Sequence, residues 1–383
     1  MMKKNICFFV TNLDPTIGGT ERVTFSLFQN IGDHGFRPFM IYTNKGSELI
    51  GDKYKLKVNS TESIEQSCEL ISKFVQDNNI KVLIIVNRIF HSEKYIKLLR
   101  KVKMVTNVKL VFSLHAAPDN WVNKNKRSMV LAKTYYKELI KSLIYKFWNP
   151  HYISVRNAYT LSDKFLLLSK SYIEPFIDTY NIERKENKLV AIPNPCPFDE
   201  NYEDSKKENI VLIVSRMQED QKRIFAALKI WHNMNHKDGW KLIIVGDGPD
   251  MNKYKNIAKN IGGVDFVGHS NNVQSYYKRS KIFMMTSIWE GLPMTLIEAM
   301  HYGCIPVVFD SFAAVYDLIR NGETGYIIPN NNICQYVNTM DSLLNDKSLV
   351  TKLSNNIINN PNDFNFETIL KLWQENINKL IEQ

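Results

Sequence analysis

The sequence predicts an α/β protein of two domains, each built on a doubly wound parallel sheet with helices on both faces. Three observations support this fold class. With 383 residues, the chain is long enough for two domains of ordinary size. Short apolar runs alternate with segments of helical periodicity in both halves, as in strand–helix–strand units. Between the halves, a proline cluster at 193–197 and an acidic stretch at 199–208 indicate a linker.

The first half contains short apolar runs that predict strands buried on both faces of a parallel sheet. They lie at 6–10, 39–42, 82–86, 110–114 and 165–168, and a run at 189–192 closes the half. The first run continues directly into a polar turn, so it is interpreted as a strand and not as a signal peptide. Residues 19–28 predict a helix that begins at a glycine pair.

The second half repeats this alternation. Strands are predicted at 210–214, 242–245, 266–267, 282–285 and 305–309, and a final helix at 366–380 carries Trp373. Open parallel sheets bind ligands at the carboxyl ends of their strands, and we expect the two domains to meet there. The loops that follow strands are therefore the first places to look for chemistry.

The composition is that of a globular protein, with 44% hydrophobic and 23% charged residues. No apolar run reaches the 18 or more residues of a spanning helix. The five cysteines are scattered, without a close pair or a Cys/His cluster, which favours neither disulfides nor a zinc site and fits a reducing cytoplasm.

The net charge of +10 is concentrated in the first half. Residues 1–195 hold 30 Lys and Arg against 17 Asp and Glu, whereas residues 196–383 hold 19 against 22. This asymmetry predicts an anionic partner for the first half, such as a membrane surface, a lipid phosphate or nucleic acid. Within it, 124–148 predicts a basic amphipathic helix that could lie on an anionic leaflet. A core helix with a solvated lysine face is the alternative.

The stretch 287–303 predicts a loop and helix between two buried strands. Pro293 suits the first helical position, and Gly303 suits the end of the helix. Glu290 lies in the loop, and Glu298 lies inside an otherwise apolar helix, where a carboxylate is costly without a partner. The two glutamates could each bind ligand hydroxyls. A surface loop with a structural glutamate is an equally weighted reading.

The start of this helix also predicts an anion site, because backbone N–H groups there lack helical partners. The groups concerned belong to Gly291, Leu292 and Met294, next to Pro293. Another loop, after the strand at 210–214, holds Arg216, Lys222 and Arg223, and two or three such cations could neutralise a diphosphate. A solvated charged loop is the alternative there.

Three further loops follow strands. Gly18, Gly19 and Thr20 form a glycine loop that could approach an anion, although a plain turn is equally compatible. His115 follows the strand at 110–114, where a structural histidine is the commoner case. Gly268 and His269 could form a wall beside a nucleobase, and 245–249 predicts a structural turn.

Taken together, these loops resemble those of family 4 retaining glycosyltransferases of the GT-B fold. The segment 290–300 is similar to the family's pair of glutamates with seven residues between them. The other matching segments are Gly18-Gly-Thr-Glu-Arg-Val23, Ile192-Pro-Asn-Pro195, Ser215-Arg-Met217, Gln221-Lys-Arg223, Val245-Gly-Asp-Gly-Pro249 and Asn321-Gly-Glu-Thr-Gly325.

The resemblance implies two Rossmann-like domains facing each other across a cleft. They would span 1–195 on the acceptor and membrane side and 209–362 on the nucleotide-sugar side. A linker at 196–208 would join them, and a helix at 363–383 would cross back to the first domain.

The resemblance also implies roles for individual residues. Arg216 and Lys222 would bind the donor diphosphate. The backbone N–H groups of Gly291, Leu292 and Met294, around Pro293, would complete the phosphate site, and the Gly18–Thr20 loop would close over the donor. Glu290 would bind hydroxyls of the transferred sugar and Glu298 those of the ribose. His115 is similar to a histidine near the donor sugar. No carboxylate is assigned as a nucleophile, so a front-face displacement is implied, without a cofactor and, since no Asp-x-Asp is present, without a required metal.

The implied function is a retaining hexosyltransferase. It would move a hexose or N-acetylhexosamine from a nucleoside-diphosphate sugar, with UDP expected, to a lipid-linked glycan in bacterial surface polysaccharide synthesis. The expected location is cytoplasmic, on the inner leaflet, without nucleic acid as a partner. A nucleotide-sugar epimerase of the same fold is the main alternative, and a non-enzymatic basic membrane- or nucleic-acid-binding protein is the other.

Overall fold

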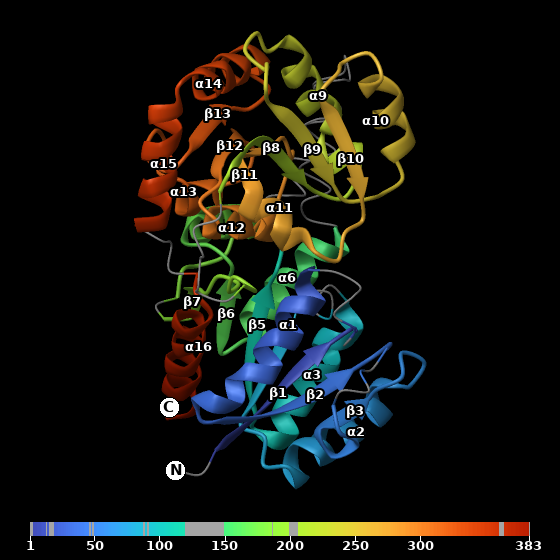
Figure 1. Cartoon of the computed structure of the whole chain (residues 1–383). Coiled ribbons are helices and arrows are strands. Elements are labelled where there is room, and N and C mark those ends of the chain that lie inside the picture. The colour runs from blue at the N-terminus through green and yellow to red at the C-terminus, as the bar shows by residue number, and fades with distance from the viewer. Residues whose placement is uncertain are drawn as a thin grey trace. The chain divides into compact units, whose positions relative to one another are not determined.

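The computed structural model describes residues 3–12, 14, 19–45, 47, 50–86, 89, 92–118, 149–185, 187–198, 206–359 and 364–382. Two compact units make up the chain (Figure 1). The first contains Met1–Pro195 and Phe366–Gln383, and the second contains Cys196–Asn365. In the described part of the chain, no helix has the length and apolar character needed to cross a membrane.

The first unit is built on a seven-stranded sheet whose neighbouring strands all pair in parallel. The order is β3-β2-β1-β4-β5-β6-β7, with β1 Lys4–Val10, β2 Phe36–Tyr42, β3 Lys55–Lys57, β4 Val82–Val86, β5 Lys109–Leu114, β6 Lys164–Leu167 and β7 Leu189–Ala191. The helices are α1 Gly19–Asn30, α2 Ile64–Asp77, α3 Glu93–Thr106, α6 Pro150–Leu161, α7 Ile173–Tyr180 and α16 Phe366–Ile381.

The C-terminal helix α16 is held to the first unit by side-chain hydrogen bonds. Gln374 Nε2 donates to the His34 carbonyl at 2.8 Å, and Lys4 Nζ donates to Asn378 Oδ1 at 2.9 Å. Trp373 lies on the buried face of this helix. The last residues of the chain therefore complete a unit that begins with its first strand.

The second unit is a six-stranded parallel sheet in the order β10-β9-β8-β11-β12-β13. Its strands are β8 Glu208–Val214, β9 Lys241–Val245, β10 Val264–Gly268, β11 Ser280–Met285, β12 Ile305–Asp310 and β13 Tyr326–Pro329. Its helices are α8 Glu219–Lys222, α9 Ile224–Asn233, α10 Met251–Ala258, α11 Val273–Arg279, α12 Met294–His301, α13 Val315–Leu318, α14 Ile333–Asn345 and α15 Lys347–Asn359.

Both sheets have the doubly wound order, which confirms the predicted fold class. In the second unit the chain runs from β8 outward through β9 and β10, then returns to the other side of β8 for β11. Helices flank both sheets in Figure 1. The strand order thus reverses between β8 and β11, and a crevice forms at the carboxyl ends of such a pair of strands.

The central strands are stable because their side chains are buried. Ile282, Phe283 and Met284 of β11 are at most 1% exposed. Burying each such side chain stabilises the fold by about 1.5–3 kcal/mol. The strand therefore provides a fixed support for the loop that follows it.

Helix α12 starts one residue later than predicted. Pro293 has φ −74° and ψ 96°, so it is the N-cap, and the helix begins at Met294. The C-terminal end agrees with the expected glycine stop, because Gly303 has φ +65°. The N–H of Gly303 donates to the Met300 carbonyl at 2.8 Å and that of Cys304 to the Ala299 carbonyl at 3.0 Å, a Schellman arrangement.

Candidate functional site

The candidate site lies where β8 and β11 end, at the point of strand-order reversal in the second unit. Two buried side chains, Ile288 and Leu292, fix the loop after β11. The N–H of Ile288 donates to the Gln221 carbonyl at 2.8 Å. Thr286 Oγ1 lies 3.0 Å from the carbonyl oxygens of Lys222 and Arg223. These bonds hold the loop after β11 against the turn between α8 and α9.

This contact brings Lys222 to Glu290. Lys222 Nζ lies 2.6 Å from Glu290 Oε1, and the two side chains are 18% and 9% exposed. Removing two charges from water is costly, and a close ion pair offsets part of that cost. The structure thus brings together two of the predicted site residues, whose opposite charges compensate each other.

Glu298 is also satisfied by the protein. It is 3% exposed, and Tyr277 Oη donates a hydrogen bond to its Oε2 at 2.9 Å. The sequence suggested that a ligand would offset the cost of burying this carboxylate, but a tyrosine hydroxyl of α11 already does so for one oxygen. Because Tyr277 is fully buried, this bond is shielded from water.

The start of α12 adjoins these carboxylates in the chain. Leu292 and Pro293 are buried, whereas Gly291 and Met294 are partly exposed. Pro293 accepts at its carbonyl from the N–H of Leu296 at 3.0 Å, which closes the first turn. The first N–H groups of a helix carry partial positive charge and suit an anion.

Arg216 lies in the loop after β8, and its side chain is exposed. The turn 245–249 supports this loop: Met217 N–H donates to the Asp247 carbonyl at 2.9 Å. Gly246 has φ +129°, and a Cβ there would lie 1.9 Å from the Ser215 carbonyl oxygen. Only glycine fits such a close approach, so this turn fixes the Arg216 loop.

Arg223 differs from the other two cations of this segment. The sequence suggests it as a third partner for a diphosphate, but it is only 8% exposed. Its Nε donates to the Thr286 carbonyl at 2.9 Å. The guanidinium therefore contacts the protein interior, and Arg216 and Lys222 remain the two candidate diphosphate ligands.

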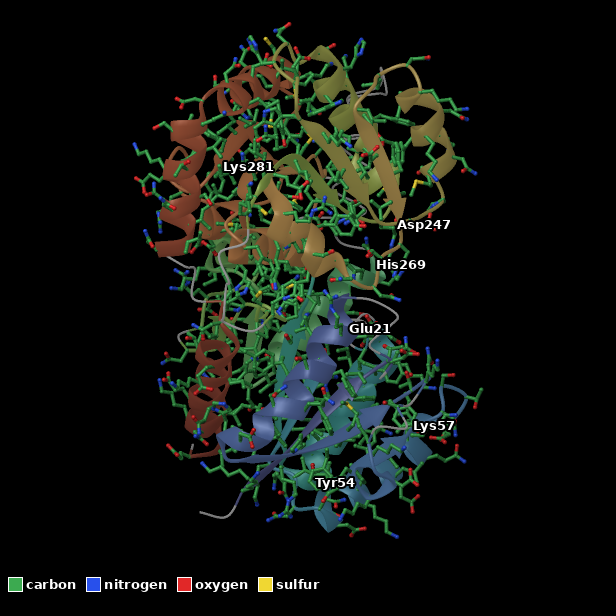
Figure 2. All side chains as sticks on the ribbon, viewed as in Figure 1. Glu21, Tyr54, Lys57, Asp247, His269 and Lys281 are labelled. Atoms are coloured by element: carbon green, nitrogen blue, oxygen red, sulfur yellow. The ribbon has the colours of Figure 1, made fainter. Side chains whose placement is uncertain are left out.

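Gly268 is the last residue of β10, and His269 follows it at the same edge of the sheet. Gly268 has φ +80°, and its carbonyl accepts from the N–H of Gly246 at 2.8 Å. His269 is exposed, and in Figure 2 it lies near Asp247, which follows the neighbouring strand β9. This edge could line a ligand site beside the Arg216 loop.

The remaining predicted site residues belong to the first unit. Gly18 lies outside the described residues, while Gly19 and Thr20 form the start of α1. His115 follows β5, and its Nε2 lies 3.0 Å from Ser113 Oγ. Its Nδ1 atom is enclosed without a hydrogen-bond partner among the described residues, although the residue keeps some exposed surface. Burial lowers the pKa of His115 to about 4.

This lowered pKa predicts a pH effect on stability. An unfolded histidine binds a proton near pH 6.5, whereas folded His115 does so near pH 4. Between these values the unfolded chain holds the extra proton, so stability falls as pH falls. When the pH is lowered from 7 to 5, we expect the free energy of unfolding to fall by about 2 kcal/mol less in His115→Gln than in the native protein. Urea unfolding at several pH values measures this difference, and equal pH slopes in both proteins would contradict it.

Two other predictions concern membrane contact and a metal ion. The basic segment 124–148 lies outside the described residues. Within the described ranges, no group of three or more His, Cys, Asp or Glu side chains is placed to hold a metal ion.

The contacts within the site carry no signal in the sequence. Tyr277 and Glu298 are 21 positions apart, and Lys222 and Glu290 are 68 apart, so neither pairing follows from local periodicity. Tyr277 is one of two consecutive tyrosines, and the sequence around it predicts only an ordinary amphipathic helix. Only the fold brings these partners together.

A family profile and a relative of known class both relate this chain to glycosyltransferases. Residues 198–360 match the profile of the family described as "Glycosyl transferases group 1". An uncharacterized glycosyltransferase of Haemophilus influenzae is 25% identical over 97% of this chain and 99% of its own length.

A second relative has an assigned activity. The GalNAc-alpha-(1->4)-GalNAc-alpha-(1->3)-diNAcBac-PP-undecaprenol alpha-1,4-N-acetyl-D-galactosaminyltransferase of Campylobacter jejuni is 28% identical over 57% of this chain and 60% of its own length. Among solved structures, Anabaena Alr3699/HepE in complex with UDP is similar over 99% of this chain and 100% of its own, with a TM-score of 0.74 and 16% identity. This last likeness concerns the fold.

Proposed function

Because this chain belongs to the group 1 family of glycosyltransferases and has the GT-B fold, we propose that it is a retaining hexosyltransferase. It would transfer a hexose or N-acetylhexosamine from a nucleoside-diphosphate sugar, with UDP as the expected nucleotide. The observation that carries this proposal is the Lys222–Glu290 ion pair on the loop before α12, together with the buried Glu298 in that helix.

In this proposal each group recognises one part of the donor. Lys222 and Arg216 would bind the diphosphate together with the first N–H groups of α12. Glu298, held by Tyr277, would accept hydrogen bonds from the ribose hydroxyls. Glu290 would accept them from the transferred sugar. Support comes from the position of these groups at the strand-order reversal, where doubly wound sheets bind nucleotides.

The chemistry would be a front-face displacement. The bond between the sugar C1 and the phosphate oxygen breaks, a bond from the acceptor oxygen to C1 forms on the same face, and the acceptor proton passes to the departing diphosphate. In this assignment Glu290 accepts hydrogen bonds from hydroxyls of the transferred sugar and does not attack carbon. Stabilising the leaving diphosphate is the main task, and Lys222 and Arg216 supply positive charge for it.

The acceptor in this proposal is a lipid-linked glycan of bacterial surface polysaccharide synthesis. Support comes from the C. jejuni relative, whose name specifies an undecaprenyl-diphosphate-linked acceptor. Residues 1–195 hold 30 cationic and 17 anionic side chains, and this positive balance would attract the first unit to an anionic inner leaflet. The enzyme would then act at the cytoplasmic face of the membrane.

A transfer assay tests the function. The protein is incubated with UDP-hexoses and UDP-N-acetylhexosamines, with and without polyprenyl-diphosphate-linked saccharides in detergent. We expect sugar transfer only when acceptor is present, and an α-linkage in the NMR spectrum of the product from an α-linked donor. Formation of an epimer from donor alone would instead establish the epimerase, and binding of no nucleotide would favour a non-enzymatic protein.

Membrane contact gives a separate prediction. Lys133, Lys137 and Lys141 share one face of the helix predicted in 124–148. Each cation near an anionic surface contributes about 1 kcal/mol. We expect the triple substitution to glutamine to weaken binding to phosphatidylglycerol vesicles by about 10²-fold, as measured by co-sedimentation at low salt.

The control for this experiment removes the same charge elsewhere. Lys229, Lys255 and Lys259 are exposed in the second unit, and their replacement by glutamine should leave vesicle binding unchanged. Equal losses in the two triple variants would show a non-specific charge effect and would remove the assignment of membrane contact to 124–148.

Tyr277→Phe tests how Glu298 is held. This change removes a hydrogen bond to a charged group while keeping the ring, and the loss of such a bond is worth a factor of about 10 or more. We expect the KM for the donor to rise about tenfold, with kcat little changed. Tyr276→Phe in the same helix is the matched control. An unchanged KM in Tyr277→Phe would show that this bond has no part in donor binding.

A further inference from the structure

Arg223 occupies an unusual backbone conformation for a large charged residue. It has φ +54° and ψ +47°, between the end of α8 and the start of α9. This left-handed conformation is sterically unfavourable for an L-residue, whereas glycine adopts it readily. An arginine that is only 8% exposed at such a position needs a role for its side chain.

The side chain is held by a set of oxygen acceptors and an aromatic ring. Nε donates to the Thr286 carbonyl and Nη2 to Asn330 Oδ1, both at 2.9 Å. Nη1 donates to Asn331 Oδ1. The guanidinium carbon lies 4.7 Å from the centroid of the Phe309 ring. All three kinds of donor nitrogen are used, so the position of the guanidinium is closely defined.

These contacts join three segments of the second unit. Arg223 belongs to the turn after α8, Thr286 to the loop after β11, and Asn330 and Asn331 to the loop after β13. Thr286 contacts this turn in the opposite direction, since its Oγ1 lies 3.0 Å from the carbonyls of Lys222 and Arg223. We call this set of four side chains, together with Phe309, the Arg223 cluster.

The Arg223 cluster adjoins both members of the Lys222–Glu290 ion pair. Lys222 immediately precedes Arg223, and Glu290 lies on the loop that Thr286 begins. Lysine is a flexible side chain that contacts phosphate through a single charged group, so its useful position depends on its backbone. A shift of about 1 Å in a positioned group can cost about 10²-fold in rate.

We propose that Arg223 is a positioning residue, which fixes the Lys222 backbone against the loop after β11 so that Lys222 meets the donor diphosphate. This inference rests on the proposed function. It adds that the loop after β13, through Asn330 and Asn331, contributes to catalysis without touching the donor. The left-handed arginine then serves the site, because a glycine at this turn would lose the link to Asn330 and Asn331 and the Nε bond to the Thr286 carbonyl.

The test uses Arg223→Gly, which suits the left-handed backbone and removes only the side chain. We expect kcat with the donor to fall by about 10²-fold. We also expect guanidinium chloride at non-denaturing concentration to restore part of the lost rate, because the free ion can occupy the vacated position. Arg223→Lys, which keeps the charge but not the planar fork, should remain impaired.

A second variant guards against a folding failure. Asn330 and Asn331 are exposed and Asn331 has φ +66°, so combining Asn330→Ala with Asn331→Gly removes two acceptors without opening the core or straining the backbone. We expect it to lower kcat about tenfold with a thermal midpoint close to that of the native protein. Asn338→Ala, at an exposed position of α14, is the control.

The outcomes separate this inference from the function on which it rests. If the native protein transfers sugar but Arg223→Gly and the Asn330/Asn331 double variant have native kcat, the positioning role is wrong. A fall in rate that guanidinium does not restore, together with native kinetics in the double variant, also overturns it. Failure of the native protein to bind any nucleotide would instead overturn the proposed function itself.

Discussion

Replacing Lys222 with alanine is expected to lower kcat by about 10²-fold or more, the usual effect of losing one donor to developing negative charge. In the proposed reaction the diphosphate gains charge as the sugar leaves, and Lys222 is the partly buried cation of the site. Its ammonium lies 2.6 Å from Glu290, so it is already desolvated and needs little reorganisation to meet a phosphate oxygen. Steady-state kinetics with saturating acceptor measure the change.

Two further variants make this result interpretable. Lys222→Ala leaves Glu290 without its cation in a site where that carboxylate is 9% exposed, so stability falls as well. Adding Glu290→Gln should recover much of the stability but none of the rate. Lys229→Ala, an exposed lysine of α9, should keep native activity. Near-normal turnover in Lys222→Ala would remove the diphosphate role of this residue.

Replacing Glu298 with glutamine is expected to raise the donor KM by about 10- to 100-fold, the value of hydrogen bonds to a charged acceptor. The amide has the volume of the carboxylate and its oxygen can still accept from Tyr277, so the apolar surroundings of α12 are kept. Its NH2 group is a donor and cannot accept the hydrogen bond that a ribose hydroxyl would donate to the carboxylate. Because the ribose is distant from the bond that breaks, kcat should change much less than KM.

The control for Glu298 is Glu323→Gln, which removes an exposed carboxylate of the same unit. Donor titrations of both variants at saturating acceptor give the comparison. If Glu298→Gln lowers kcat but leaves the donor KM unchanged, the residue acts on the reacting sugar and the assignments of the two glutamates must be reversed.

Most strands of both sheets could be predicted because a parallel strand that is buried on both faces has a continuous apolar sequence. The exceptions are β3 and β13, which were not predicted. Both lie at an edge of a sheet, and each has fewer fully buried positions than the central strands. With one neighbour instead of two, an edge strand needs little apolar sequence, and Lys55-Leu-Lys57 offers a single apolar residue.

The candidate site was predictable in its loops but not in its contacts. Glycine, proline and glutamate after β11 pointed to a helix start with two carboxylates, because local backbone rules apply to neighbouring residues. The interior role of Arg223 depends on Thr286, which is 63 positions away. A basic residue beside another basic residue indicates a solvated loop, and only tertiary contacts show that one side chain faces the interior.

The central claim is that the loop after β11 and the start of α12 form a nucleoside-diphosphate site. Isothermal titration of the native protein with UDP, GDP, ADP and CMP tests it most directly, with Glu298→Gln titrated in parallel. We predict binding of one nucleoside diphosphate at a single site, little or no binding of the monophosphate, and a weaker affinity in the variant by about 10-fold or more. Absence of binding for every nucleotide, or equal affinity in Glu298→Gln, would contradict the claim.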